Sequence, residues 1–378
     1  MRLYFNYILL IFLLCACGSK ETLSLQKSRD IVLRFETAIG NLSNISYFRE
    51  GTTGYISYVN TKTHSLNFRN IQSDSIDFRV DLHSFDSIQD TEDGIACLVH
   101  TRDSIFILLN ERNTVYLADS AGKIKAHWDV NVSLENNNSK YVLQDSPSMR
   151  LFYQDHRIYI QVVRDDIAVN TPANRQVYFN TPAELILDIS KEPFSITNTT
   201  GQWPMIYRTG KGYQDFWPAR CVNNRNEPVY SFSVNDSLFT YKDERLISVT
   251  NAASTFPRHV SAYPDDSAMH FAYLKKYNAS ESRYKFIFFN PYLDTYYRVF
   301  SRGVQEQDKD ERIHQLWSFI VLDPQLNTLC ETGFHTGEFN YFSILPVPEG
   351  VMICKTNGPE DGRNILRFGL FNLRTDEI

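Results

Sequence analysis

Four short apolar stretches separated by tight turns, all within residues 95–128, constrain the fold more than any other feature of the sequence. The stretches are rich in Ile, Leu, Val and aromatic residues, and the turns contain Asp, Asn and Gly, which is typical of antiparallel β-hairpins. A four-stranded meander of this length has the size of one β-propeller blade. The predicted strands are residues 95–100, 104–109, 114–118 and 123–128.

The same pattern recurs along the chain, with connections of variable length. Complete copies begin near residues 45, 149, 218 and 284, and a last copy from residue 341 has three strands where a blade needs four. Residues 31–35 form a spare apolar strand, which would complete the last blade and remove the exposed sheet edges. We therefore predict an all-β protein, a β-propeller with six blades of four antiparallel strands, closed by the N-terminal strand. A pair of β-sandwiches stays open as the alternative, because the repeats are irregularly spaced.

Three insertions separate predicted strands, at residues 164–177, 201–217 and 302–315, and we expect them to be loops. No segment after the N-terminal leader has the length and periodicity that predict a helix. The 26 Phe and 22 Tyr residues favour strands as well.

Charge and motif content restrict the classes of partner. The chain has 38 Lys and Arg against 44 Asp and Glu, a formal net charge of −6. Because phosphate backbones are bound by basic patches, we expect no nucleic-acid partner. The spacing of His and Cys residues matches no metal site, and the common hydrolase and phosphate-loop motifs are missing, so we expect no metal and no cofactor.

The N-terminus has the features of a bacterial lipoprotein signal. Arg2 precedes an apolar run, and Leu14, Ala16 and Cys17 resemble the −3, −1 and +1 positions of the lipoprotein cleavage site. The run is shorter than the ~20 residues of a membrane-spanning helix, which is one alternative, and an ordinary signal peptide is the other. We expect a signal peptide over residues 1–16, a tether lipidated at Cys17 over residues 17–30, and a single propeller domain over residues 31–378.

This signal also predicts a location. The lipid would anchor the protein in the cell envelope. No Asp follows Cys17 as an inner-membrane retention signal, so we expect the outer membrane, with the periplasmic or surface face left open.

Four cysteines follow the predicted lipidation site: Cys97, Cys221, Cys330 and Cys354. Cys97 and Cys354 have strand-like surroundings, and we expect the cysteines to be small buried hydrophobes. An oxidising compartment would permit a disulfide, and Cys330 with Cys354 is the pair to test first.

The leader, residues 289–298 and the C-terminal segments 348–351 and 366–371 together resemble a known family. That family groups uncharacterised cell-envelope lipoproteins of gut bacteria, as a domain of unknown function similar to six-bladed β-propellers. The resemblance implies the fold and the envelope location. It implies no catalytic residues, because the family has no known activity.

Two places in the sequence have the residue types of a ligand site. Trp203 and Trp217 flank a glycine-containing insertion, with Arg220 nearby; an exposed tryptophan beside a guanidinium can stack on a sugar ring or hold a carboxylate. Arg298 shares a strand face with Tyr296 and could bind an anion in the propeller funnel. The alternatives are tryptophans packed onto the blades and an arginine that joins two blades by a salt bridge.

Taken together, these features favour a lipid-anchored binding or scaffold module for a protein, peptide or glycan partner. The alternative is an envelope hydrolase or lyase acting on glycans or peptides. An enzyme should gather acidic groups with perturbed pKa values at the channel mouth. A binding module should instead show an apolar or aromatic patch there.

Substituting Cys17→Ser should abolish lipidation, because serine lacks the thiol that is alkylated. We expect the variant to remain unprocessed or to move to the soluble fraction, as measured by cell fractionation and immunoblotting. Normal processing with persistent membrane association would show that the leader has been misread.

Overall fold

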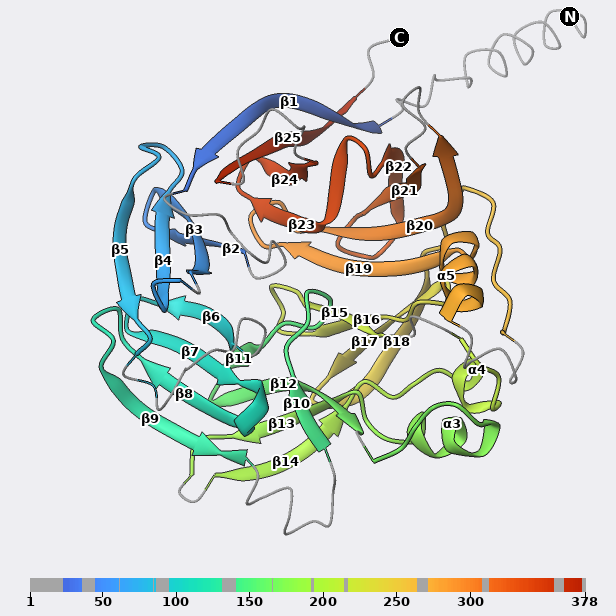
Figure 1. Ribbon diagram of the computed structural model, residues 1–378, viewed down its shortest axis with the longest axis horizontal. Coiled ribbons are helices and arrows are strands. Elements are labelled where there is room, and N and C mark those ends of the chain that lie inside the picture. Colours follow the sequence, from blue (N-terminus) through green and yellow to red (C-terminus); the bar gives the residue numbers. More distant parts are fainter. Residues whose placement is uncertain are drawn as a thin grey trace, which may run out of the picture.

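The computed structural model describes residues 23–35, 45–60, 62–83, 85, 95–130, 141–164, 166–191, 194–213, 217–263, 271–307, 313–356 and 364–375. The predicted leader and Cys17 lie outside this part of the chain. Six antiparallel sheets stand around a central axis as six blades (Figure 1), which confirms the predicted β-propeller. Within the described ranges, no helix combines the length and apolar character that a membrane crossing requires.

Blades 1, 2, 4 and 5 are meanders whose first strand lies nearest the axis (Figure 1). Blade 1 consists of β2 (Ser46–Glu50), β3 (Thr53–Asn60), β4 (Ser65–Asn70) and β5 (Ile76–Asp81). Blade 2 consists of β6 (Ile95–Thr101), β7 (Ser104–Leu109), β8 (Thr114–Ala118) and β9 (Ile124–Asp129), with the short helix η2 (Asn110–Arg112) between β7 and β8. Blade 4 consists of β15 (Ala219–Val222), β16 (Pro228–Ser231), β17 (Ser237–Lys242) and β18 (Arg245–Asn251). Blade 5 consists of β19 (Arg283–Asn290), β20 (Thr295–Gln307), β21 (Ile313–Leu322) and β22 (Thr328–His335).

Blade 6 is completed by the N-terminal strand, as predicted. Its strands are β23 (Phe339–Val347), β24 (Gly350–Lys355), β25 (Ile365–Thr375) and β1 (Leu23–Arg34). The last two pair antiparallel from Leu23 opposite Thr375 to Arg34 opposite Ile365.

The closing strand is longer than the sequence predicted, because β1 begins at Leu23 rather than at residue 31. Residues 23–30, assigned above to the tether, therefore belong to the sheet. The strand was not predicted over Lys27–Asp30 because these residues are polar and exposed. On the outermost strand of a blade, polar side chains can face solvent while the backbone keeps its hydrogen bonds to the neighbouring strand.

Blade 3 departs from the simple meander. It consists of β10 (Tyr141–Gln144), β11 (Phe152–Gln154), β12 (Arg157–Arg164), β13 (Glu184–Asp188) and β14 (Ser195–Thr200). Both β10 and β11 pair with β12, so the innermost position of this blade is filled by two short strands. Between them the chain leaves the sheet over residues 145–151, which we call the channel segment.

The insertions contain structure where loops were predicted. The first holds α3 (Pro172–Tyr178), the second holds α4 (Met205–Arg208), and the third is a ribbon extension of β20 and β21. A further helix, α5 (Phe271–Ser280), lies between blades 4 and 5. These helices are too short for a periodic sequence signal, and α3 is specified locally by Pro172 at its first turn and by the Thr171 cap.

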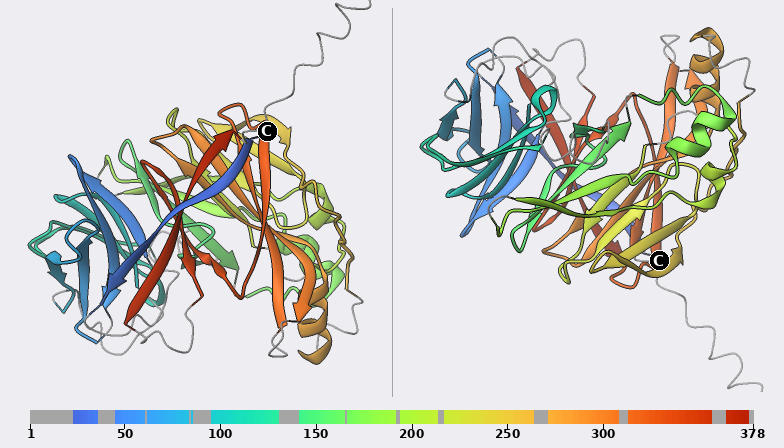
Figure 2. Two further views of the ribbon diagram at one scale, coloured as in Figure 1. Left: turned by 90° about the horizontal axis from the view of Figure 1, so that it is seen from above. Right: turned by 90° about the horizontal axis from the view of Figure 1, so that it is seen from below.

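The blades give the ring two different faces. Turns between first and second strands, and between third and fourth strands, lie on one face and are short; we call it the hairpin face. Connections from second to third strands and between blades lie on the other, which we call the insertion face, and they carry α3, α4, α5 and the β20–β21 extension. Figure 2 shows α5 on the side of the ring opposite the end of β25.

Each junction between blades is filled by an apolar cluster. Leu33, Phe35, Ile56 and Phe368 meet where β1 joins blade 6 to blade 1. Stability of the ring therefore depends on β1 through its side chains as well as through its hydrogen bonds.

Truncating Leu33, which is 1% exposed, should leave a cavity at this junction. We expect Leu33→Ala to lower the free energy of unfolding by about 2–5 kcal/mol, measured by chemical denaturation. The exposed Arg29→Ala on the same strand should change it by less than about 0.5 kcal/mol. Equal effects of the two substitutions would show that β1 does not contribute through its apolar face.

Candidate functional site: a divided central channel

The channel segment has a defined conformation. The carboxylate of Asp145 accepts a hydrogen bond of 2.7 Å from the Leu151 amide, and Ser146 donates through Oγ to Gln161 Oε1 at 2.7 Å. Ser146 and Met149 also form an isolated β-bridge. Two of these contacts fold the segment on itself, and the Ser146 contact fastens it to β12 of its own blade.

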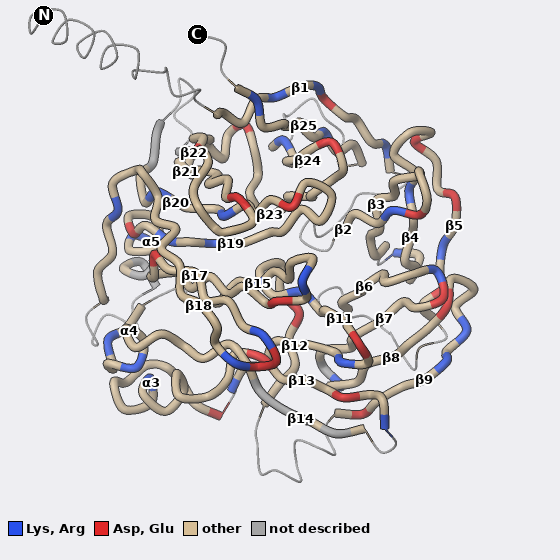
Figure 3. Tube along the Cα trace, turned by 180° about the vertical axis from the view of Figure 1, so that it is seen from behind, with Lys and Arg blue, Asp and Glu red and all other residues tan. Residues whose placement is uncertain are grey.

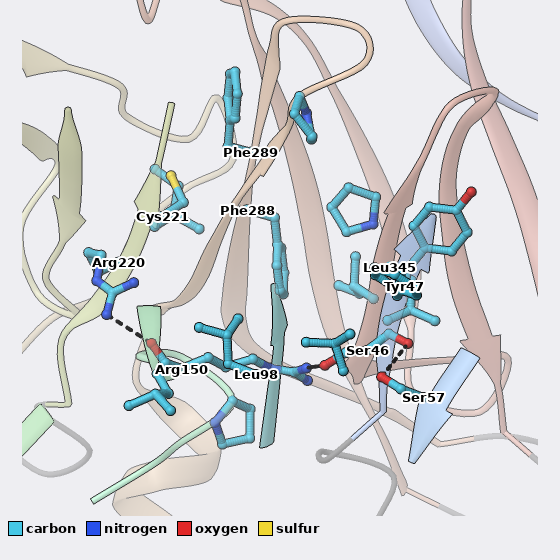
Figure 4. Close-up of a pocket in the computed structure, with 18 of the residues that line it drawn as sticks. Ser46, Tyr47, Ser57, Leu98, Arg150, Arg220, Cys221, Phe288, Phe289 and Leu345 are labelled. Carbon is cyan, nitrogen blue, oxygen red and sulfur yellow. Dashed lines mark hydrogen bonds between the residues drawn. The ribbon is translucent and has the colours of Figure 1, made fainter. Parts of the chain in front are cut away.

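Arg150 extends from this segment across the channel to blade 1 (Figure 4). Its Nη1 donates to the carbonyl of Ile45 at 2.8 Å and also to Ser46 Oγ. From the other side, Arg220 Nη2 donates to the Arg150 carbonyl at 2.8 Å. Three blades are thus joined through one residue of the channel segment.

Burial shifts the pKa values of the charged groups in this segment. It lowers the pKa of the Arg150 guanidinium, against the attraction of Asp145. It raises the pKa of the Asp145 carboxyl to about 6, and the positive charges of Arg150 and Arg220 limit that rise.

The segment separates two cavities, and Pro147 lines both of them. The first has a volume of about 300 Å³ and reaches the ends of the innermost strands near Tyr292 and Pro346; we call it the hairpin-side cavity. The second has a volume of about 250 Å³ and lies near the start of β19 and before β15; we call it the insertion-side cavity.

All six innermost strand positions contribute to the hairpin-side cavity (Figure 4). Aromatic rings of Tyr47, Phe48, Phe288 and Tyr292 form much of its wall. Among the described residues that line it, none is Asp, Glu or His, and its charged groups are the guanidinium groups of Arg150 and Arg220. The described lining is therefore largely aromatic and apolar, with two cationic groups.

Arg220, one of the predicted ligand residues, is engaged by a buried carboxylate. Its Nε donates to Glu184 Oε1 at 3.1 Å, its Nη2 donates to the same oxygen, and the Tyr230 hydroxyl donates to Glu184 Oε2. Burial and the neighbouring carboxylate raise the pKa of the Tyr230 phenol well above its ordinary value. Arg220 therefore joins blades 3 and 4 besides lining the cavity.

Arg298 is fully buried and does not face the funnel. It donates to the carbonyls of Asn235, Asp236 and Ala252 at 2.6–2.8 Å, and its guanidinium lies 3.3 Å from the centre of the Tyr284 ring. Burial lowers its pKa to about 10. The predicted anion site is thus replaced by a junction between blades 4 and 5, made with main-chain oxygens because the strand turns Arg298 toward blade 4.

The two tryptophans have different environments. Trp203 is 4% exposed and packs against Phe179, Tyr207 and Phe232 at the junction of blades 3 and 4, so its ring is not accessible to a ligand. Trp217 is 38% exposed and lines the insertion-side cavity. Of the two tryptophans predicted to contact a ligand, Trp217 is therefore the one whose ring is accessible.

The four described cysteines are free thiols, so the Cys330–Cys354 pair does not form. Cys330 packs at the junction of blades 5 and 6, whereas Cys354 packs at the junction of blades 6 and 1. Burial raises the pKa of the Cys354 thiol to about 12, in keeping with a small hydrophobe. No group of three His, Cys, Asp or Glu residues with metal-binding geometry occurs in the part of the chain that the structure describes.

A third cavity, of about 380 Å³, lies between hairpins of blades 3 and 4. Its charged groups include partnered ones: Arg157 Nη1 lies 3.5 Å from Glu244 Oε1, and Arg225 Nε lies 2.8 Å from Glu227 Oε2. Acidic and basic residues are interspersed around the whole ring (Figure 3).

The sequence did not reveal Arg150, Lys285 or Phe342 as channel residues. All three lie where an innermost strand is interrupted or bulged, and strand alternation does not predict where such side chains point. The available signal was the polar, proline-containing stretch around Pro147, which breaks the blade 3 pattern.

The fold and the divided channel define a six-bladed β-propeller with internal cavities between its innermost strands. The chain belongs to the family described as a domain of unknown function, DUF4221, whose model matches residues 43–333, about three-quarters of the sequence. This finding confirms the family resemblance noted above.

Solved structures agree with this assignment. The chain is similar to a DUF4221 family member from Bacteroides vulgatus, with 18% identity, a TM-score of 0.75, and coverage of 94% of this chain and 100% of that one. It is also similar to a "putative exported protein" from Bacteroides fragilis, with 8% identity, a TM-score of 0.52, and coverage of 96% and 97%. At these identities the similarity shows the fold. No curated protein matches the sequence.

Removing the Glu184 charge should leave Arg220 buried without its partner. We expect Glu184→Gln to lower the free energy of unfolding by about 3–5 kcal/mol, measured by chemical denaturation. The matched control is Glu244→Gln, which removes the more exposed pair with Arg157 and should cost about 0–1 kcal/mol. A cost for Glu184→Gln as small as that of the control would mean that the buried pair does not join the blades.

Proposed function

We propose that the protein is a lipid-anchored cell-envelope binding or scaffold module that presents its insertion face to a protein, peptide or glycan partner. The observation that carries the proposal is the separation of the two faces. The connections with described helices and the β20–β21 extension lie on one face, and β1 begins on the other. Variable loops on a rigid scaffold are where binding residues concentrate.

Lipidation at Cys17 would fix the orientation of the ring. Cys17 stands six positions before Leu23, and an extended chain of that length reaches ~20 Å. Leu23 pairs with Thr375 at the hairpin face. The hairpin face would then stay close to the membrane, and the insertion face would turn toward partners.

The envelope location rests on the leader and on the absence of Asp after Cys17, which favour the outer membrane. The name of the Bacteroides fragilis structure, an exported protein, supports the same location.

A hydrolase or lyase acting on envelope glycans or peptides is the second candidate. The observation that favours it is the Asp145 carboxyl, whose pKa burial raises to about 6, in the range of a general acid or base. Against it, the described linings of the hairpin-side and insertion-side cavities contain no Asp, Glu or His that could act with Asp145.

Binding and catalysis can be separated with the detergent-solubilised full-length protein on glycan and peptide arrays, with mass spectrometry of the array compounds after incubation. We expect retention of a defined ligand class without cleavage. A bulky maleimide on Phe342→Cys should block retention, because the label would cover the insertion face. The comparison is made in a Cys330→Ser background, since burial raises the pKa of the Cys97, Cys221 and Cys354 thiols and slows their reaction, whereas Cys330 is half-buried.

The matched control is the same label on Asp103→Cys, in the exposed β6–β7 turn of the hairpin face, which should leave retention unchanged. Cleavage products that disappear in Asp145→Asn would favour the enzyme instead. Loss of retention only with the Asp103 label would show that the hairpin face is the recognition face.

A further inference from the structure

The hairpin-side cavity is accessible from the hairpin face. It reaches the ends of the innermost strands beside Pro346 and beside Tyr292, which is 39% exposed. Its volume of about 300 Å³ is at the lower end of the ~300–1,000 Å³ of pockets that hold small ligands. This size suits a ligand with one ring and a short chain, and it is too small for a long acyl chain.

Aromatic side chains form much of the cavity wall. Phe48 and Phe288 are half-buried lining residues, so each presents part of its ring to the cavity. Tyr47 and Tyr292 are in edge-to-face contact, with their ring centres 6.1 Å apart and an angle of 85° between the ring planes. Aromatic rings gain stability from edge-to-face and offset packing beyond the burial of apolar area. The wall therefore favours a planar aromatic group over an aliphatic chain.

Arg150 brings a positive charge to the same cavity (Figure 4). It is half-buried, and its Nη1 donates to the Ile45 carbonyl and to Ser46 Oγ. Because Ser46 Oγ accepts this hydrogen bond, the Ser46 hydroxyl proton points away from Arg150 and can be donated to a ligand oxygen. The lining thus places a guanidinium group and a hydroxyl donor side by side.

The charge distribution around the cavity favours an anion. Two carboxylates attract the guanidinium groups from outside the described lining: Glu184 accepts from Arg220, and Asp145 attracts Arg150. Burial nevertheless lowers the pKa of Arg150, so its charge remains costly to hold. A further negative group beside Arg150 would reduce that cost, whereas a cationic ligand would increase it.

We propose that the hairpin-side cavity binds a small aromatic carboxylate, in which a short chain joins one ring to one carboxylate. The ring would pack among Phe48, Phe288 and Tyr292, and the carboxylate would lie beside Arg150 and accept from the Ser46 hydroxyl. Charge attraction acts whether or not every guanidinium donor is engaged, so Arg150 can keep its contacts with blade 1. A sugar would place its hydroxyl groups against apolar walls, where they would lose hydrogen bonds to water.

Isothermal titration calorimetry of the detergent-solubilised full-length protein at pH 7 tests this site, with the heat of titration into detergent alone subtracted. The probe is 3-phenylpropionate, its neutral isostere is 3-phenylpropanamide, and octanoate is the aliphatic acid. We expect 3-phenylpropionate to bind about tenfold more tightly than the amide, because the bond to a charged group is the stronger one. It should bind about threefold more tightly than octanoate, because an alkyl chain lacks the aromatic packing.

Filling the cavity should block binding. Leu98 is a half-buried lining residue, and Leu98→Trp would place an indole ring in the space of the ligand. We expect this variant to weaken 3-phenylpropionate by about tenfold or more. The matched control is Leu246→Trp on β18, because Leu246 is 49% exposed and absent from the lining, and it should leave the affinity unchanged.

Two substitutions test the carboxylate contact. Ser46→Ala removes the hydroxyl donor and should reduce the preference for the acid over the amide, and Arg150→Gln should abolish that preference. The matched control is Arg157→Gln, which removes a more exposed guanidinium outside the lining and should preserve it. Because the three ligands are also compared in the unmodified protein, a variant that fails to fold does not decide the result.

Equal affinity for 3-phenylpropionate and its amide, or no binding of either, would overturn the proposed site. Octanoate that binds as tightly as 3-phenylpropionate would overturn the aromatic class. Full affinity in Leu98→Trp would show that the ligand binds elsewhere. The site lies on the face opposite to the one proposed for recognition, so these outcomes leave the proposed function unaffected, and the array result alone decides that proposal.

Discussion

The antiparallel pairing of β1 with β25 is the constraint on which the ring depends. Without β1, blade 6 would present the unpaired edge of β25, and the junction with blade 1 would lose Leu33 and Phe35. One strand thus supplies backbone hydrogen bonds at an edge and apolar surface at a junction. The six junctions form a closed circle, so a defect at this one opens the ring and leaves blades 6 and 1 each without one neighbour.

Buried guanidinium groups connect blades that share no backbone pairing. Arg298 joins blade 5 to blade 4, Arg220 joins blade 4 to blade 3, and Arg150 reaches from blade 3 to blade 1. Most of their acceptors are main-chain carbonyls, which keep a full hydrogen-bonding capacity in a low-dielectric interior. Arginine suits this role because its several donors lie in a fixed plane and can satisfy carbonyls from different segments.

The blades were predictable because local turn chemistry and strand alternation act within about 35 residues, and residues 95–128 carried both signals. The closing strand was predicted only in part, since its exposed residues Lys27–Asp30 look like a loop until β25 lies beside them. Trp217 was predicted as a ligand residue from its position beside a glycine-containing insertion and Arg220, and the structure places it on the lining of the insertion-side cavity. Lys285 and Phe342 were missed because bulges arise from competition between neighbouring strands, which a single sequence does not display. Trp203 and Arg298 were predicted as ligand residues, but in the structure both are buried by packing between blades.

Ring closure also imposes an order on folding. Leu23 and Thr375 are paired in the finished sheet although they stand near opposite ends of the sequence. Because a chain emerges from the ribosome beginning with its N-terminus, β1 is made before every other described strand and its partner β25 after all of them. Until then β1 is a strand with unsatisfied edges, and contacts of such long sequence separation form slowly. The exposed charges of Lys27–Asp30, in the middle of β1, would keep the unpaired strand from pairing with other chains until β25 has been synthesised.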